Sequence, residues 1–191
     1  MTCTSGLSPN EWNSTKVLIN IYGIAAAMSY LHSNNILHLE IKPENILLDD
    51  SFYPKLCDFY LSTFEDTLPN SICGTPLYIS PEIFKEFAYS KASDVYAFGF
   101  LVYQLITNEN PFEQYRMYDL FITITQGVRP SIPSEVPEHY KKLIESCWAA
   151  NPSDRSTFDD ILKQLTDFIT DTVDEDEFYK YVDYIQNSQT L

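Results

Sequence analysis

Positively charged residues are scarce in this chain of 191 residues. Lysine and arginine together number 12, against 27 aspartate and glutamate residues, so the formal net charge is −15. A surface that binds nucleic acid or an anionic membrane needs clustered lysine and arginine, and this balance argues against both kinds of partner. Protein partners remain, including proteins with basic patches.

Cysteine and histidine are also few, and their spacing does not suit a metal site. The cysteines lie far apart without a CxxC pair, and the histidines form no HExxH arrangement. This excludes the common zinc sites and a disulfide framework, and it predicts free thiols in a reducing compartment. The residues concerned are Cys3, Cys57, Cys73 and Cys147, with His32, His38 and His139.

Long apolar runs are missing as well. The longest, from Val95 to Tyr103, is far short of the roughly 18 residues that predict a membrane span. The N-terminus does not show the basic and then apolar layout of a secretory signal peptide. We therefore expect a cytoplasmic protein, with the nucleus as the alternative. Apolar residues make up 45% of the chain, which is enough for one domain with a sizeable core.

Apolar residues recur at helical spacing in five segments, which predict helices. Gly23 lies inside the first of them and should cost about 1 kcal/mol relative to alanine. The segment 95–106 is apolar nearly all round, which predicts a buried central helix. Ser156 and Asp159 predict a capping box for the last helix. The five segments are 12–33, 95–106, 115–126, 137–151 and 156–169.

Between the first two helices the pattern changes to short apolar pieces separated by proline and aspartate. These predict small strands at 36–37, 46–48 and 55–57. Residues 58–82 have no periodicity, and a loop of that length is usually functional. From Leu165 onward there are seven acidic residues and one basic residue. This predicts a solvated acidic tail, with a docking segment for a basic partner as the alternative.

Five motifs follow one another at a recognisable spacing. They are HLEIKPENILLD (38–49), DFY (58–60), GTPLYISPE (74–82), SDVYAFG (93–99) and CWAANPSDRSTF (147–158). In this order they resemble the protein kinase family, from residue 12 to about residue 170. The KPEN sequence and the Gly74-Thr75 pair resemble the serine/threonine-specific pattern. The block with Cys147-Trp148 and Arg155 is similar to the tyrosine-kinase-like group.

The resemblance implies phosphorylation of protein serine or threonine with ATP and Mg²⁺. It makes Glu40 the catalytic base, Lys42 the contact to the transferring phosphate, and Asn45 with Asp58 the metal ligands. Lys42, Asn45 and Asp58 would thus hold the nucleotide. Phosphoryl transfer needs a carboxylate, an ammonium group and oxygen ligands for the metal, and these residue types supply them. The alternative is a polar turn with an Asx-type bond from Asn45 and surface charges elsewhere.

By the same resemblance, four residues should support the architecture. His38 would brace the catalytic loop, and Asp94 would accept hydrogen bonds from the backbone of that loop. Asp94 has an alternative role as a carboxylate favoured by the dipole at a helix N-terminus, and both roles are compatible. Glu82 and Arg155 resemble the buried ion pair of the family, and removing one partner of such a pair typically costs about 3–5 kcal/mol.

Three positions depart from the family pattern. Glu40 replaces aspartate at the base, and a misplacement of about 1 Å can cost about 10²-fold in rate. Leu39 replaces an arginine that grips a phosphate on the activation loop, and residues 58–82 contain no lysine or arginine. Tyr60 replaces a glycine, whose backbone conformations a tyrosine reaches only at about 1–2 kcal/mol. We also expect the tyrosine ring to crowd the cleft.

A small lobe of this family needs five strands, a helix, a glycine-rich loop and a lysine, or roughly 40 residues before any loops. Only 37 residues precede His38, the five glycines of the chain form no GxG, and Lys16 is the only lysine before His38. We therefore expect a mostly α fold consisting of the large, C-terminal lobe alone, a helical bundle with a few short strands. The expected organisation is a disordered N-terminus (1–11), the lobe (12–170) and the acidic tail (171–191).

Two functions remain open from the sequence. One is a protein kinase whose damaged site leaves this chain impaired by itself, with a protein substrate or a partner kinase. The other is a pseudokinase that binds proteins as a scaffold, through its helical surface or through the exposed upper face of the lobe. A truncated copy that folds poorly is a further alternative, although the helix caps and apolar faces favour folding.

Overall fold

Helices dominate the part of the chain that the structure describes, a computed structural model covering residues 12–112 and 115–188. The helices are α1 (Ser14–Ser33), α2 (Pro81–Glu86), α3 (Lys91–Thr107), α4 (Met117–Thr125), α5 (Glu138–Cys147), α6 (Phe158–Thr166) and α7 (Glu175–Ser188). The strands are β1 (Ile36–Leu37), β2 (Ile46–Leu48), β3 (Pro54–Leu56) and β4 (Thr63–Phe64). Short 3₁₀ turns are η1 (Pro43–Asn45), η2 (Pro76–Tyr78) and η3 (Pro152–Asp154). The mostly α fold is confirmed.

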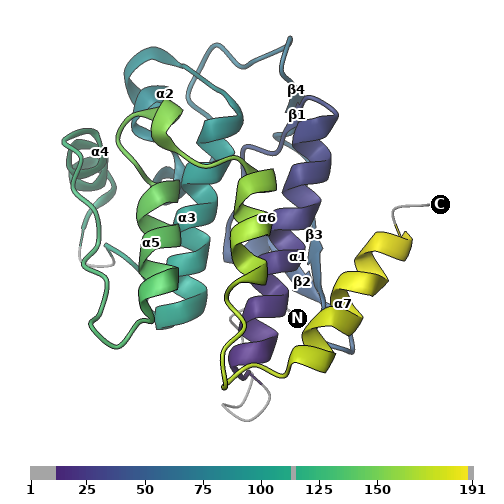
Figure 1. Cartoon of the computed structure of the whole chain (residues 1–191). Coiled ribbons are helices and arrows are strands. Elements are labelled where there is room, and N and C mark those ends of the chain that lie inside the picture. Colours follow the sequence, from purple (N-terminus) through teal and green to yellow (C-terminus); the bar gives the residue numbers. More distant parts are fainter. Residues whose placement is uncertain (1–11, 113–114, 189–191) are drawn as a thin grey trace.

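Helix α3 lies at the centre of the bundle, as predicted. Twelve of its 17 residues are buried, and Ser90 with Ser93 forms a capping box at its N-terminus. Figure 1 shows α1, α3, α5 and α6 side by side, with α3 against α5 and α1 against α6. Because α3 is apolar on nearly every side, it can contact several neighbours at once and hold them around one core.

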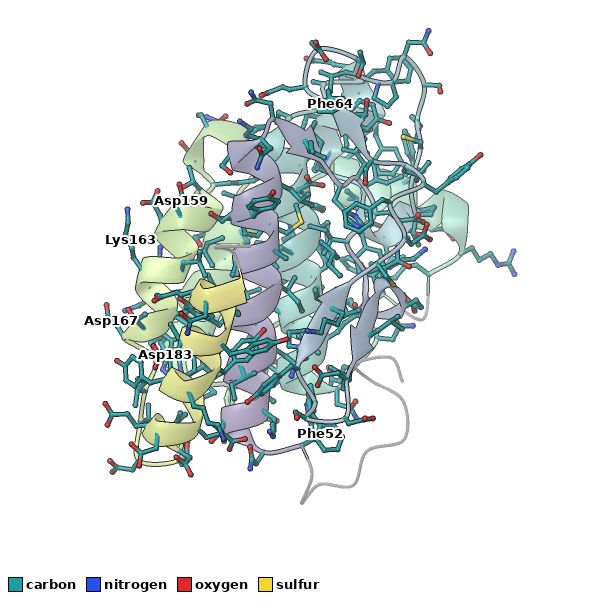
Figure 2. All side chains as sticks on the ribbon, turned by 90° about the vertical axis from the view of Figure 1, so that its right-hand side faces the viewer. Phe52, Phe64, Asp159, Lys163, Asp167 and Asp183 are labelled. Atoms are coloured by element: carbon teal, nitrogen blue, oxygen red, sulfur yellow. The ribbon has the colours of Figure 1, made fainter. Side chains whose placement is uncertain are left out.

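The strands of the described residues form two antiparallel pairs. In one pair β1 lies beside β4, with Ile36 opposite Phe64, and in the other β2 lies beside β3, with Ile46 opposite Leu56. Figure 2 shows the pairs at opposite ends of α1, where Phe64 and Phe52 are labelled. The predicted strands are confirmed to within one residue, whereas β4 lies in the segment that was expected to be a loop.

Helix α7 corrects the expectation of an acidic tail over 171–191. Its side chains Phe178, Tyr181 and Val182 are buried in the core, while Asp174 and the first turn of the helix keep their acidic groups largely at the surface. The sequence EFYKYVDYI places its apolar residues three and four apart, which is a helical pattern that the acidic composition obscured. Residues 1–11, expected to be disordered, lie outside the described part.

The N-cap of α6, the cysteines and the apolarity of the helices bear on three further expectations. The N-cap of α6 is Thr157, which accepts a hydrogen bond from Asp160 N at 3.2 Å, and the predicted cap at Ser156 is therefore wrong by one residue. Cys57, Cys73 and Cys147 are free thiols, as predicted, while Cys3 lies outside the described residues. Among the described helices, none has the length and apolarity required to cross a bilayer.

Gly23 has a packing role that explains its place inside a helix. A Cβ atom at this position would lie 2.6 Å from Pro54 Cγ and 3.0 Å from Tyr181 Cζ, with Tyr181 Oη closer still. Real Cβ atoms do not make such contacts with ring atoms. The glycine therefore allows both β3 and α7 to approach α1, and the helix tolerates the propensity cost in exchange for this packing.

We predict that Gly23→Ala lowers the free energy of unfolding by about 1–3 kcal/mol, because it overpacks the contact with Pro54 and Tyr181. Helix propensity alone predicts the opposite sign, a gain of about 1 kcal/mol. Urea unfolding followed by circular dichroism measures the difference. Tyr30 is exposed on the same helix, and Tyr30→Ala should change stability by less than about 0.5 kcal/mol. A Gly23→Ala variant as stable as the parent chain would contradict this packing.

Candidate active site

A single buried carboxylate organises the segment that follows β1. Asp94, in the first turn of α3, is only 1% exposed. Its Oδ2 accepts hydrogen bonds from the backbone N–H of His38 at 2.9 Å and contacts His32 Nε2 at 2.9 Å, and its Oδ1 accepts one from the N–H of Leu39 at 2.8 Å. Asp94 thus accepts backbone N–H groups of this loop, and it lies in the first turn of α3, where the helix dipole favours a negative charge.

His38 is fully buried, and its ring links the two segments that carry the candidate site residues, 38–45 and 57–58. Its Nδ1 accepts a hydrogen bond from the N–H of Glu40 at 3.3 Å, and its Nε2 lies 3.3 Å from the carbonyl of Cys57. One ring nitrogen therefore accepts and the other donates, which is the pattern of a neutral imidazole. Burial lowers the pKa of His38 despite the opposing charge of Asp94, so the ring stays neutral near pH 7. The geometry agrees with the expected bracing role.

The structure brings three polar side chains together in front of this loop. Lys42 Nζ lies 2.7 Å from Glu40 Oε1 and donates to Thr75 Oγ1 at 3.0 Å. Thr75 in turn donates to the same Glu40 oxygen at 3.2 Å. Thr75 is 35 residues away from Glu40 in sequence, and the sequence motif alone gave it no such role. The Glu40–Lys42–Thr75 triad is a closed ring of charge-assisted hydrogen bonds.

The two candidate metal ligands lie on neighbouring segments. Asn45 is buried, its Nδ2 donates to the carbonyl of Glu40 at 2.9 Å, and its own carbonyl accepts from the N–H of Cys57 at 2.9 Å. Asp58 directly follows Cys57 in the sequence. The bond from Cys57 N to the Asn45 carbonyl therefore brings the segment of Asp58 beside that of Asn45. Asp58 is exposed, and its carboxylate receives a long contact of 3.4 Å from Tyr60 N.

The donor chemistry of these two residues fits Mg²⁺. The amide nitrogen of Asn45 is occupied, so its oxygen is the atom available to a cation, and Asp58 adds a carboxylate. Mg²⁺ is commonly held by one or two carboxylates and completes its shell with waters and substrate phosphates. Within the described residues there is no group of three or more His, Cys, Asp or Glu side chains that could hold a metal. Asn45 and Asp58 therefore fit a Mg²⁺ ion that is bound together with substrate phosphates.

The departure from the family pattern at Tyr60 has a different outcome from the one expected. Tyr60 is 90% exposed, so its ring does not fill the described site, and its φ is not positive. In the two motifs 38–49 and 58–60, positive φ angles occur instead at Leu39, at 62°, and at Asp58, also at 62°. Such a conformation costs a leucine roughly 1–2 kcal/mol, and the bond from Leu39 N to Asp94 stabilises it.

Glu82 and Arg155 form the expected ion pair at the base of α2 and α3. Arg155 Nη1 and Nη2 donate to the two Glu82 oxygens at 2.6 Å and 2.9 Å. Nη1 and Nε also donate to the carbonyls of Ala92 and Ala149. Burial alone would raise the pKa of Glu82, but the hydrogen bonds and charge of Arg155 outweigh it and hold the pKa below its usual value.

Tyr89 is a structural anchor that the sequence motifs did not indicate. Its hydroxyl donates to the carbonyl of Ser71 at 2.8 Å and accepts from the N–H of Cys73 at 2.9 Å. Burial, the largest cause, raises the pKa of Tyr89 to about 12. These bonds fix the segment just before Gly74 and Thr75, and they thus help to place Thr75 beside Glu40. An isolated tyrosine outside the motifs carried no signal of this contact.

Comparison with known proteins supports the assignment of the motifs. A family model described as a protein kinase domain matches residues 10–166. A putative serine/threonine-protein kinase/receptor of Acanthamoeba polyphaga mimivirus is 37% identical over 148 residues, which cover 76% of this chain and 9% of that protein. A probable LIM domain-containing serine/threonine-protein kinase of Dictyostelium discoideum is 36% identical over 77% of this chain and 23% of its own length.

A third relative, a dual specificity protein kinase of Dictyostelium discoideum, is 32% identical over 164 residues. The match covers 81% of this chain and 31% of that relative. The chain thus spans less than a third of the length of each of these three proteins.

We predict that Asp94→Asn lowers the free energy of unfolding by about 1–3 kcal/mol, because His38 and Leu39 donate to different oxygens of Asp94 and an amide nitrogen in place of one of them cannot accept its bond. Urea unfolding measures the loss, and NMR should show the largest amide shifts at those two residues. Asp66 is exposed, and Asp66→Asn serves as the control with less than about 0.5 kcal/mol of change. Equal stability of the Asp94→Asn variant and the parent would exclude this role.

We predict a pH-dependent effect of Glu82→Gln, which removes one charge of the ion pair and costs about 3–5 kcal/mol at pH 7. The folded-state pKa of Glu82 is depressed, so its contribution is present above the unfolded-state value of 4.5 and is lost as the pH falls through the folded-state value. The stability gap between parent and variant should therefore shrink below about pH 4.5.

Urea unfolding at a series of pH values from neutral to acidic measures this gap. Glu138 is exposed at the start of α5, and Glu138→Gln provides a control whose stability difference from the parent stays small throughout. A gap for Glu82→Gln that remains constant into strong acid would show that the charge of Glu82 does not stabilise the fold.

Proposed function

Because the chain belongs to the protein kinase family, we propose that it is the large lobe of a serine/threonine-directed protein kinase of the tyrosine-kinase-like group. In this proposal it transfers phosphate from ATP to a protein hydroxyl when a nucleotide-holding small lobe, which lies outside the described residues, is present. The observation that carries the proposal is the Glu40–Lys42–Thr75 triad, in which a candidate base and a candidate phosphate contact are already held together.

The triad suggests how these residues divide the work. Lys42 and Thr75 both contact Oε1 of Glu40, which leaves Oε2 to accept the proton of the substrate hydroxyl. The Lys42 ammonium group would offset negative charge on the phosphate that moves. Asn45 and Asp58 would hold Mg²⁺, which supplies further charge neutralisation when it is bound. The protein therefore contributes mainly by positioning and electrostatics.

The longer side chain of Glu40 keeps the contacts of the site. Lys42 and Thr75 reach Glu40 at 2.7 Å and 3.2 Å, so the extra methylene does not break the triad. It does displace the oxygens relative to an aspartate on the same backbone, and displacements near 1 Å can cost about 10²-fold in rate. We infer that Glu40 slows proton transfer without removing the base.

A non-catalytic binding module is the second candidate function. Apolar side chains stand exposed around Asp58, including Phe59 at 49% and Tyr60 at 90%, and Leu47 on β2 is exposed as well. An exposed apolar patch of this kind is typical of a surface that binds another protein. Such a partner would be a protein substrate or a second kinase at the upper face of the lobe. The cytoplasm, with the nucleus as the alternative, remains the expected location.

Radiolabelled phosphate transfer from ATP and Mg²⁺ tests the proposed activity. The chain alone should show no transfer, whereas a fusion that places the small lobe of a related kinase before residue 12 should phosphorylate serine or threonine of a basic protein substrate. In the fusion, Asp58→Ala should abolish transfer, since it removes a metal ligand. Glu40→Asp should raise the rate up to about 10²-fold, because it shortens the displaced base.

Matched controls separate a missing activity from a missing fold. Asp66→Asn changes an exposed acid of the same loop and should leave the rate of the fusion unchanged. A thermal melt with and without ATP and Mg²⁺ reports nucleotide binding, because a ligand at 100 times its dissociation constant stabilises by about 2.7 kcal/mol. A fusion that binds nucleotide without any transfer dependent on Asp58 would reject the kinase proposal and favour the binding module.

A further inference from the structure

Helix α7 lies beyond the residues that match the family model, yet it is firmly packed on the lobe. The match ends at residue 166, and α7 begins at Glu175. Phe178 contacts Tyr22 on α1 with ring centroids 5.3 Å apart, and Tyr181 contacts Tyr53 with centroids 4.5 Å apart. Figures 1 and 2 both show α7 against the N-terminal half of α1. Helix α7 therefore packs as an integral part of the folded domain.

The contacts of α7 converge on the β2–β3 hairpin. Tyr53, at the start of β3, packs against both Tyr181 and Tyr184, with centroids 4.5 Å and 5.6 Å away. Lys55 Nζ donates to Tyr184 Oη at 3.2 Å and lies 5.2 Å from the centroid of its ring. Two successive turns of α7 thus hold one side of the hairpin through tilted aromatic contacts and a cation–π contact.

Lys16 ties the same three elements together at the turn of the hairpin, where its Nζ also lies 5.6 Å from the centroid of the Tyr53 ring. Its Nζ pairs with Glu177 on α7 at 2.5 Å and donates to the carbonyl of Ser51 in the hairpin turn at 3.1 Å. Asp174 N also donates to Thr15 Oγ1 at 2.8 Å, just before α7 begins. The hairpin turn is therefore bonded to α1 and α7 through one ammonium group.

The hairpin held in this way carries the candidate metal ligands. Asn45 directly precedes β2, Asp58 follows two residues after β3, and the bond from Cys57 N to the carbonyl of Asn45 closes the end between them. We propose that α7 clamps the β2–β3 hairpin onto α1 and thereby positions Asn45 and Asp58. Tyr181 and Glu177 are then positioning residues. The role of the two ligands rests on the proposed function, whereas the mechanical coupling does not.

Hydrogen exchange of the full chain, resolved by NMR, tests the coupling. Tyr181→Ala should speed exchange of the Cys57 amide and of the β2–β3 ladder by about tenfold or more relative to amides of α5, because a local unit opens more readily once its contacts are removed. Tyr179 is exposed on the same helix, and Tyr179→Ala should leave the ratio unchanged. If Tyr181→Ala fails to fold, Glu177→Gln, which removes the acidic partner of Lys16 and leaves the aromatic contacts in place, should shift the same ratio by a smaller factor.

Two outcomes would overturn the clamp. Faster exchange confined to α7 would show that the hairpin is rigid without it, and an equal rise in α5 would show global destabilisation only. In the kinase fusion, Tyr181→Ala should also raise the Mg²⁺ concentration needed for half-maximal rate more than it lowers the rate at saturating Mg²⁺. An unchanged Mg²⁺ requirement would reject the positioning of the ligands. An inactive parent fusion would instead reject the proposed function, and the exchange ratio would still decide whether the clamp exists.

Discussion

The hydrogen bonds accepted by the carboxylate of Asp94 are the constraint on which the candidate site depends. One side chain at the start of the central helix binds His32 at the end of α1 and the backbone of His38 and Leu39. Burying a charge is costly unless its bonding capacity is filled, and here three donors fill it. The energetics that stabilise α3 in the core therefore also fix the path of the loop that leads to Glu40.

From that loop the remaining geometry follows in steps. His38 connects the loop to the carbonyl of Cys57, and the backbone of Cys57 bonds to Asn45, so both candidate ligand segments are tied to the same centre. Leu39 accepts a left-handed conformation that its bond to Asp94 compensates. Tyr89 holds the later segment from the other side, which places Thr75 on Glu40 and Lys42. The triad is thus formed within the lobe itself.

The parts of this arrangement that could be predicted were those with a local pattern. The helical spacing over 12–33 and the apolar run over 95–106 predicted α1 and the buried α3, and the ordered motifs predicted the partnership of Glu82 with Arg155.

Contacts between distant segments left no such pattern. Thr75 reaches Glu40 across 35 residues, and Tyr89 reaches Cys73 because both pack in one apolar cluster with Ile83 of α2. The strain expected at Tyr60 lies at Leu39 and Asp58 instead, because the backbone turns where the bonds to Asp94 and Asn45 require it. Helix α7 did have a signal, the spacing of Phe178, Tyr181 and Val182, but the seven acidic residues and one basic residue from Leu165 onward suggested a solvated tail.

The Glu40–Lys42–Thr75 triad is preorganised by the loop that Asp94 holds. A crystal structure of the chain alone, at a resolution that places side-chain atoms independently, tests this preorganisation most directly. We expect Lys42 Nζ within hydrogen-bonding distance of both Glu40 and Thr75, about 2.7–3.2 Å, with both oxygens of Asp94 bonded to the loop. A loop whose His38 and Leu39 amides still bind Asp94 while Glu40 turns away from Lys42 and Thr75 would contradict the claim.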